Sequence, residues 1–278
     1  MNALNISESW YAFIKKDGIS VRNFIDKKGK NPKAVIVMHS YGMPAKMNEI
    51  VAICKKYNLT LIEDAASTLG STINNQKCGT FGDFGIVSFN GNKIITTSGG
   101  GALICNNEGQ KNDAIFLATQ ARDNAIHYQH SEIGYNYRMS NILAGIGRAQ
   151  MEVLNKHVEL RRANNTFYRG IFKDIKGVSV FKEPSEDYFS NHWLSCIVIN
   201  HKKALISSEE LRIKLEAKNI ESRPLWKPMH LQPVFKNTPF YGNGISQKLF
   251  ETGLCLPSGS NLSENDFERI LNTINSSF

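Results

Sequence analysis

The stretch AVIVMHSYGMPAKMNEIVAICKKYNLTLIEDAA, residues 34–66, decides the predicted fold. Ala34–Met38 is a short apolar run of the kind found in buried strands. Ala45–Tyr57 has apolar residues at helical spacing, and Leu59–Ile62 is a second short strand-like run. A strand, a helix and a strand in this order are typical of an α/β domain built on a mostly parallel sheet.

Both halves of the remaining chain also show segments typical of helices and strands. Further predicted elements are strands over Phe84–Phe89, Gly101–Cys105, Val178–Phe181, Trp193–Ile199 and Ile220–Leu225, a long helix near 140–165, and helices beginning at the capping patterns Ser207/Glu210 and Ser263/Asp266. Strands and helices alternate less regularly in the second half of the chain. We therefore predict a large α/β domain over residues 1–160 and a smaller α+β domain over residues 161–278.

The composition is that of an ordinary globular protein. Of 278 residues, 41% are hydrophobic and 21% charged, which argues against a disordered chain or a coiled coil. No apolar run is long enough to cross a bilayer, and Met1–Asn5 is not a basic region leading into an apolar one. We therefore expect a cytoplasmic protein that does not bind a membrane. The five cysteines are scattered and odd in number, which favours neither disulfides nor a metal site.

The net charge of +8 leaves several classes of partner open. A basic surface can attract nucleic acid, an anionic membrane or phosphorylated small molecules, or it can be a solvated lysine-rich face. A basic nucleic-acid-binding module is therefore a remote alternative. We expect no nucleic acid partner, because the sequence contains no RNA-binding signature and no zinc-finger spacing.

Polar residues that could take part in binding or catalysis follow two of the predicted strands. Asp64 comes directly after one strand, and Ser88 with Lys93 comes at the end of another. Ligand sites of open α/β sheets lie at such strand ends. A glycine-rich turn over 98–101 could bind phosphate through backbone N–H groups, although no P-loop or dinucleotide fingerprint is present. Taken singly, Asp64 could be a helix N-cap and Lys93 a solvated loop lysine.

Together these residues fit the requirements of pyridoxal 5'-phosphate. A lysine amine with a lowered pKa can form a Schiff base with the cofactor. A carboxylate keeps the pyridine nitrogen protonated, so that the ring accepts electrons. Hydroxyls and backbone amides can hold the phosphate.

Several stretches, in order along the chain, resemble the DegT-type (DegT/DnrJ/StrS) sugar-nucleotide aminotransferases. The matching stretches are 37–42 (VMHSYG), 62–66 (IEDAA), 88–101 (SFNGNKIITTSGGG), 134–139 (GYNYRM), 223–230 (RPLWKPMH) and 255–262 (CLPSGSNL). The last two are most similar to the branch that aminates UDP-linked 4-keto-6-deoxy sugars for bacterial glycans, as in the N-acetylbacillosamine and exopolysaccharide pathways. The resemblance implies a type I pyridoxal-phosphate transferase fold: a mostly parallel sheet with helices on both faces, and a smaller C-terminal α+β domain.

The resemblance also implies a cofactor site. Lys93 aligns with the catalytic Schiff-base lysine, Asp64 with the pyridinium partner and Ser88 with the phosphate-binding serine. Asn136 aligns with an asparagine that reaches the cofactor of a neighbouring subunit, which implies a homodimer. Ser67 stands where the family usually has glutamine or glutamate near the ring's 3-hydroxyl, so that contact is lost or bridged by water.

Substrate-binding positions are implied near the C-terminal end. His230 resembles a position lining the sugar-nucleotide site, and Arg223 and Trp226 are substrate-lining candidates. Each could instead be structural: His230 as a packed loop histidine, and Arg223 and Trp226 as packing residues. The implied reaction transfers an amino group from an amino-acid donor, with glutamate expected, to a UDP-linked keto sugar.

The beginning of the chain departs from the family pattern. Asn2–Ile14 resembles a segment well inside family members, so we expect the family's first large block to be absent. That block holds a glycine-threonine phosphate loop, an aromatic residue that stacks on the ring, and the first strand of the sheet with its helices. Its absence would expose apolar surface and an unpaired strand edge. A catalytically impaired remnant, or one product of a split gene, is therefore an alternative to a complete enzyme.

Overall fold

The structure is a computed structural model that describes residues 4–5 and 32–278. The expected resemblance of Asn2–Ile14 to an internal family segment lies outside the described residues, apart from Leu4–Asn5. The helices are α2 Met47–Tyr57, α3 Glu108–Ala118, α4 Asn141–Glu152, α5 Leu154–Phe172, α6 His201–Ala204, α7 Ser208–Glu216, α8 Ile245–Thr252 and α9 Glu264–Asn275, with 3₁₀ turns η1 Met229–Leu231 and η2 Pro233–Phe235. The strands are β1 Leu4–Asn5, β2 Ala34–Met38, β3 Thr60–Asp64, β4 Thr72–Ile73, β5 Gln76–Lys77, β6 Phe84–Ser88, β7 Gly101–Cys105, β8 Val178–Val180, β9 Tyr188–Phe189, β10 Ser195–Ile199, β11 Arg223–Pro224 and β12 Gly253–Leu256.

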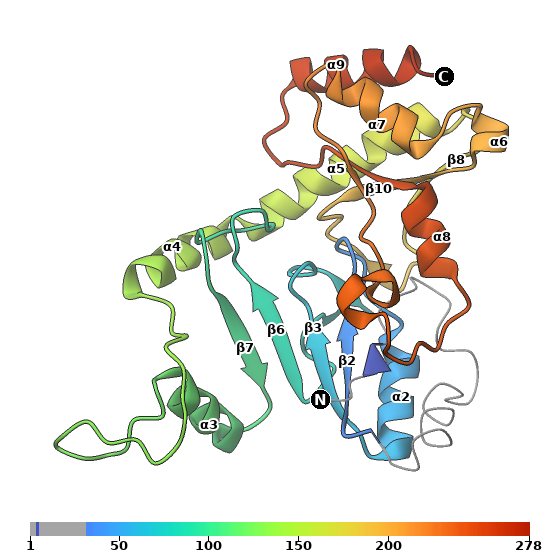
Figure 1. Ribbon diagram of the computed structural model, residues 1–278. Coiled ribbons are helices and arrows are strands. Elements are labelled where there is room, and N and C mark those ends of the chain that lie inside the picture. Colours follow the sequence, from blue (N-terminus) through green and yellow to red (C-terminus); the bar gives the residue numbers. More distant parts are fainter. Residues whose placement is uncertain (1–3, 6–31) are drawn as a thin grey trace.

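The larger sheet has the strand order β1-β2-β3-β6-β7. β1, β2, β3 and β6 run parallel to one another, and β7 pairs antiparallel with β6. The predicted mostly parallel sheet is therefore confirmed. The carboxyl ends of β2, β3 and β6 point to the same edge, toward α5 and the smaller sheet (Figure 1).

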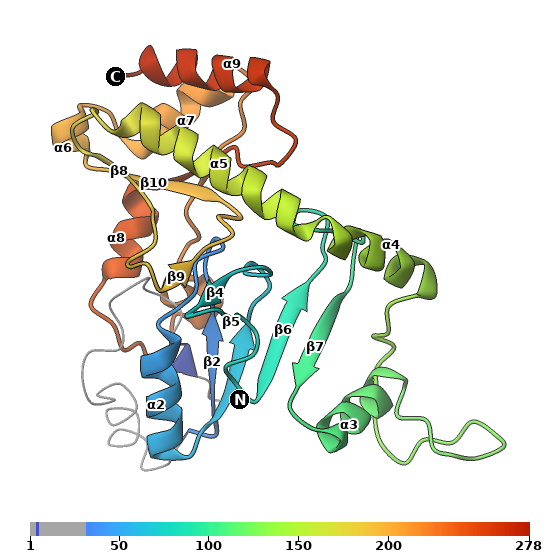
Figure 2. The ribbon, with the colours of Figure 1, turned by 180° about the vertical axis from the view of Figure 1, so that it is seen from behind.

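The two faces of this sheet differ in burial. The core face, which we define by Val35, Val37, Leu61 and Glu63, is buried, and its apolar members pack in one cluster with residues of α2. This helix runs alongside β2 in both views (Figures 1 and 2). The open face, which we define by Asp64, Ile86, Ser88 and Leu103, is less covered: Ile86 is 39% exposed and Leu103 47%. Asp64 pairs with Ile86 and Ile86 with Leu103, so the strand register places these residues side by side.

The smaller sheet is antiparallel, with the order β11-β12-β10-β8. Its core contains Tyr168 from α5, Leu211 from α7 and Ile274 from α9, all fully buried. The predicted capping boxes are both present: Ser207 with Glu210 opens α7, and Ser263 with Asp266 opens α9.

Some predicted boundaries differ from the structure. The long helix expected near 140–165 is two helices, α4 and α5, that meet at Val153 and run nearly in line past the ends of β6 and β7 (Figure 2). The strand expected over Ile220–Leu225 is only the two residues of β11, because Pro224 has no N–H to donate to the ladder. The predicted domain boundary after residue 160 falls inside α5, so the two-domain division stays a proposal.

The described residues add two further findings. Among residues 4–5 and 32–278, no helix is long and apolar enough to cross a membrane, and no group of three or more His, Cys, Asp or Glu side chains could hold a metal ion. The five cysteines are all free thiols.

Candidate active site

Lys93 lies in the connection between β6 and β7, at the carboxyl edge of the larger sheet. Its backbone N–H donates to the carbonyl of Asn90 at 3.0 Å, which closes a tight turn. The side chain is half-buried, and its Nζ lies 4.3 Å from the ring centroid of Trp193. Burial lowers the pKa of Lys93 below its usual value, although the charge of Asp64 acts in the opposite direction. A lowered pKa makes the neutral, nucleophilic amine more accessible near neutral pH.

Asp64 and Ser88 are the last residues of β3 and β6. Both belong to the open face. One carboxylate oxygen of Asp64 accepts the N–H of Ala66 at 3.1 Å, and the Ser88 hydroxyl accepts the N–H of Asn90 at 3.3 Å. The Ser88 hydroxyl thus contacts the turn that carries Lys93, and the Asp64 carboxylate is close enough to influence the lysine's pKa.

A buried carboxylate supports this edge of the sheet. Glu63 is fully buried and accepts hydrogen bonds from the N–H groups of Gly79 at 2.8 Å and Gly82 at 2.7 Å, and from the His39 ring at 3.1 Å. The other His39 ring nitrogen accepts the N–H of Ala45 at 2.9 Å, so the ring proton faces Glu63. Burial alone would raise the pKa of Glu63, but these donors outweigh it and hold the pKa below its usual value.

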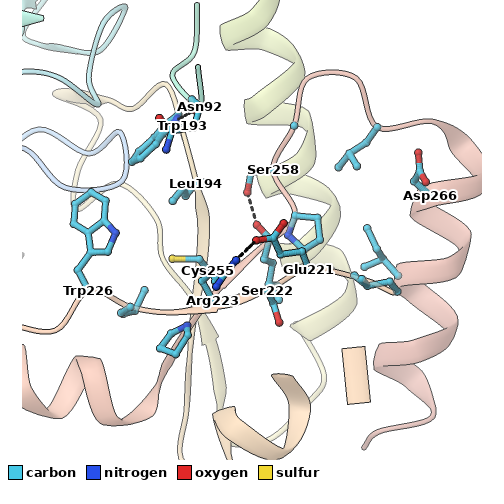
Figure 3. Close-up of a pocket in the computed structure, with 18 of the residues that line it drawn as sticks. Asn92, Trp193, Leu194, Glu221, Ser222, Arg223, Trp226, Cys255, Ser258 and Asp266 are labelled. Carbon is cyan, nitrogen blue, oxygen red and sulfur yellow. Dashed lines mark hydrogen bonds and ion pairs between the residues drawn. The ribbon is translucent and has the colours of Figure 1, made fainter. Parts of the chain in front are cut away.

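A cavity of about 1000 Å³ opens between the Lys93 turn and the smaller sheet. Three predicted site residues, Lys93, Arg223 and Trp226, line it. Figure 3 shows Trp193 and Trp226 toward one end of the cavity and Asp266 toward the other, with Arg223 and Glu221 between them. Arg223 and Glu221 form an ion pair of 2.7 Å in which both side chains are largely exposed. A guanidinium at such a position can bind a phosphate group in two-point geometry.

Aromatic residues from distant parts of the chain meet at the Lys93 end of this cavity. The Tyr41 hydroxyl accepts the N–H of Trp226 at 2.7 Å, and their rings are 4.4 Å apart. The rings of Trp226 and Trp193 are 5.9 Å apart. Burial raises the pKa of Tyr41, so its hydroxyl stays protonated. No role was predicted for Tyr41 or Trp193. The available signals were a tyrosine three residues after the predicted strand Ala34–Met38 and a tryptophan at the start of the predicted strand Trp193–Ile199.

The other predicted site residues do not line the cavity. Asp64 and Ser88 are at the strand ends described above, and the remaining three lie in other parts of the fold. Ser67 is buried, and its hydroxyl donates to the carbonyl of His39 at 2.8 Å. Asn136 is exposed, in the segment between α3 and α4. His230 lies in η1, with its ring stacked on Phe240 at 3.7 Å. The structure therefore brings Lys93 together with Asp64, and places these three side chains elsewhere.

Sequence similarity to known proteins identifies the family of this chain. The family model for the DegT/DnrJ/EryC1/StrS aminotransferases matches residues 15–275. The chain belongs to this aminotransferase family. EpsN of Bacillus subtilis (strain 168), which carries the name of a pyridoxal phosphate-dependent aminotransferase, is 48% identical over 252 residues; the match takes in 89% of this chain and 64% of EpsN. The GDP-perosamine synthase of Escherichia coli O157:H7 is 34% identical over 281 residues, covering 99% of this chain and 75% of the synthase.

Solved structures of the DegT family share the fold. The crystal structure of a DegT DnrJ EryC1 StrS aminotransferase from Brucella abortus matches with a TM-score of 0.84 at 26% identity, covering 98% of this chain and 72% of that one. The predictions of the family and of its α/β fold are thus confirmed, and so is, at the level of the family, the prediction of its pyridoxal-phosphate cofactor, which the name of EpsN carries. The chain spans 64% of the length of EpsN.

Proposed function

We propose that this chain acts as a pyridoxal-phosphate-dependent aminotransferase on a nucleotide-linked keto sugar. The observation that carries the proposal is the position of Lys93, half-buried, with a lowered pKa, and on the wall of a cavity large enough for a sugar nucleotide. Amino transfer needs a lysine of this kind within reach of both cofactor and substrate.

The residues around Lys93 fit pyridoxal phosphate in their chemistry. When bound, the cofactor supplies a carbonyl group that exchanges with amines and a ring that withdraws electrons. Lys93 would hold it through its amine and, when released, would move a proton. Asp64 would keep the ring nitrogen protonated, and Ser88 would donate to the phosphate. Ser67 stays a predicted cofactor contact.

The proposed substrate is a UDP-linked 4-keto-6-deoxy sugar, aminated with glutamate as the donor, for surface glycan or exopolysaccharide synthesis. Arg223 can bind a phosphate, and Trp226 offers a flat surface for stacking. His230 remains a proposed contact beyond the cavity wall. Support for UDP comes from the resemblance of 223–230 and 255–262 to the UDP-sugar branch. The GDP-perosamine synthase relative makes a GDP-linked sugar the alternative to be compared in the assay.

We further propose that two copies form a homodimer. Apolar side chains are exposed on α4 and on the segment before it, including Ile142 at 72% and Ile126 at 104%. Exposed apolar side chains that gather on one face can mark an interaction site. Asn136 belongs to the same segment, so a second copy would bring it near the cofactor site of its partner. The proposed location is the cytoplasm, which suits five free thiols.

The test begins with the purified chain and pyridoxal phosphate. We expect a visible absorption band and, after borohydride reduction and peptide mass mapping, one pyridoxyl group on Lys93. Lys93→Ala should lose both, and the exposed Lys56→Ala on α2 should lose neither. No band, or labelling spread over surface lysines, would mean that the chain is an impaired remnant. A band that survives in Lys93→Ala would refute the assignment of the Schiff-base lysine.

A second assay tests the substrate. The loaded protein is given glutamate and either a UDP-linked or a GDP-linked 4-keto-6-deoxy sugar, and the amino sugar is measured by mass spectrometry. Product from the UDP sugar alone supports the proposal. Product from the GDP sugar alone keeps the aminotransferase and replaces the substrate.

A further inference from the structure

One tryptophan contacts both the amine of Lys93 and the backbone that carries it. Trp193 comes from the segment just before β10, whereas Lys93 lies between β6 and β7. The Trp193 ring centroid is 4.3 Å from the Lys93 Nζ. The indole N–H donates to the carbonyl of Asn92 at 2.8 Å. That carbonyl belongs to the peptide bond joining Asn92 to Lys93, so a single side chain contacts both the turn and the amine.

Trp193 is itself held firmly. It is 4% exposed. Its backbone N–H donates to the side-chain oxygen of Asn191 at 2.8 Å, and its backbone carbonyl accepts from the Arg161 guanidinium at 2.6 Å. The Asn191 amide in turn donates to the carbonyls of Ser67 at 3.1 Å and Leu69 at 2.9 Å, in the segment after β3. The backbone that carries the ring is therefore hydrogen-bonded to α5 and, through Asn191, to the segment that follows β3.

The contact between Lys93 and Trp193 has the geometry of a cation–π interaction. An ammonium within about 6 Å of a ring centroid is attracted to the face of tryptophan more strongly than to that of phenylalanine. Among the described residues, the charge that acts on the pKa of Lys93 is Asp64. Other charged side chains line the same cavity: Glu221, Arg223, Lys227, Asp266 and Arg269.

We propose that Trp193 is a positioning residue for Lys93. Its ring face receives the ammonium form of the side chain at the cavity wall, and its indole N–H fixes the turn. The amine of Lys93 therefore returns to one place whenever it is not attached to the cofactor. The importance of this place for catalysis rests on the proposed function of Lys93, but the contact itself can be tested without cofactor.

The first experiment measures the pH dependence of Lys93 labelling in the cofactor-free protein. Trace acetic anhydride and peptide mass spectrometry give the labelling midpoint of each lysine in the folded chain. If the ring stabilises the ammonium, Trp193→Leu should lower the midpoint of Lys93 by about half a unit to one unit, and Trp193→Phe by less. Tyr168→Phe is the matched control, because Tyr168 belongs to the core of the smaller sheet and the substitution removes a buried aromatic hydroxyl that donates to the backbone carbonyl of Pro257. It should leave the Lys93 midpoint unchanged.

The second experiment measures position separately from charge. Above all the labelling midpoints, where Lys93 is neutral in every variant, we follow the rate at which pyridoxal phosphate is captured on Lys93 and trapped by borohydride. Trp193→Phe cannot donate to the Asn92 carbonyl, so its rate should fall by about threefold to tenfold. Tyr168→Phe should match the unsubstituted chain.

The outcomes separate this inference from the proposed function. A midpoint that stays or rises in Trp193→Leu, or a capture rate unchanged in Trp193→Phe, would make Trp193 a packing residue only and overturn the inference. If Trp193→Leu does not fold, Trp193→Phe still tests it through both readouts. If the unsubstituted chain captures no cofactor on Lys93, the proposed function fails while the labelling midpoints still decide the role of Trp193.

Discussion

The core face and the open face of the larger sheet are built from the same strands, yet they do different things. Glu63 and Asp64 are adjacent, and because side chains alternate along a strand they point to opposite faces. Glu63 is fully buried and hydrogen-bonded to the backbone of the Gly79–Gly82 turn. Asp64 is only partly buried, at the edge where Lys93 lies. One step along the strand therefore separates a carboxylate that is bound into the fold from one that lies beside Lys93.

The largest expected effect is on the core face, at Glu63. Both carboxylate oxygens of Glu63 accept hydrogen bonds from N–H groups. Glu63→Gln replaces one of these oxygens with an NH₂ group, which cannot accept them. The variant therefore loses charge-assisted hydrogen bonds and leaves buried N–H groups without an acceptor. We expect the free energy of unfolding to fall by about 3 kcal/mol. Urea unfolding followed by circular dichroism measures it, with the exposed Glu159→Gln as control. A loss no greater than that of the control would show that Glu63 does not stabilise the fold.

Substitutions of apolar side chains should also lower the free energy of unfolding more on the core face than on the open face, although by less than Glu63→Gln. Val37 is fully buried on the core face, whereas Ile86 is 39% exposed on the open face. Val37→Ala should cost about 2 kcal/mol through lost burial and a cavity, and Ile86→Ala less than about 1 kcal/mol. Parallel urea titrations of the two variants provide the measurement. Equal losses would mean that the open face is covered in solution.

Acid should expose the contribution of Glu63 without any substitution. Its pKa is lowered in the folded state, so its contribution is complete above the unfolded pKa of about 4.3. That contribution disappears as the pH falls through the lower folded pKa. The unsubstituted chain should therefore lose stability more steeply than Glu63→Gln between neutral and strongly acidic pH. Parallel curves for the two proteins in urea titrations across that range would contradict this assignment.

The sequence predicted the bounds of the strands better than it predicted how the strands pair. β2 and β7 have the predicted bounds, because each is a short run of mostly apolar residues that can be recognised locally, although β2 is partly buried and β7 is largely exposed. The two capping boxes were also readable, since each is a local pattern of four residues. α3 was missed because none of its residues is buried, so it has no apolar stripe. The antiparallel direction of β7 depends on tertiary pairing and has no local signal.

The candidate site shows the same limit. Asp64, Ser88 and Lys93 could be predicted together because the ends of neighbouring parallel strands meet at one edge of the sheet. The contact of Trp193 with the Lys93 turn joins residues 101 positions apart in the chain. It depends on how the smaller sheet packs against the larger one, and no periodicity in the sequence encodes that packing.

The smallest expected change in stability is at Asp64 on the open face. Asp64→Asn keeps a side-chain oxygen that can accept the Ala66 N–H, so the free energy of unfolding should stay within about 0.5 kcal/mol. The loss of the negative charge should nevertheless lower the pKa of Lys93, because the Asp64 carboxylate raises that pKa in the unsubstituted chain. Competitive labelling should therefore show a lower Lys93 midpoint in Asp64→Asn than in the unsubstituted chain. If Asp64→Asn instead unfolds as readily as Glu63→Gln, or if the Lys93 midpoint rises, adjacent carboxylates on opposite faces do not divide stability from chemistry.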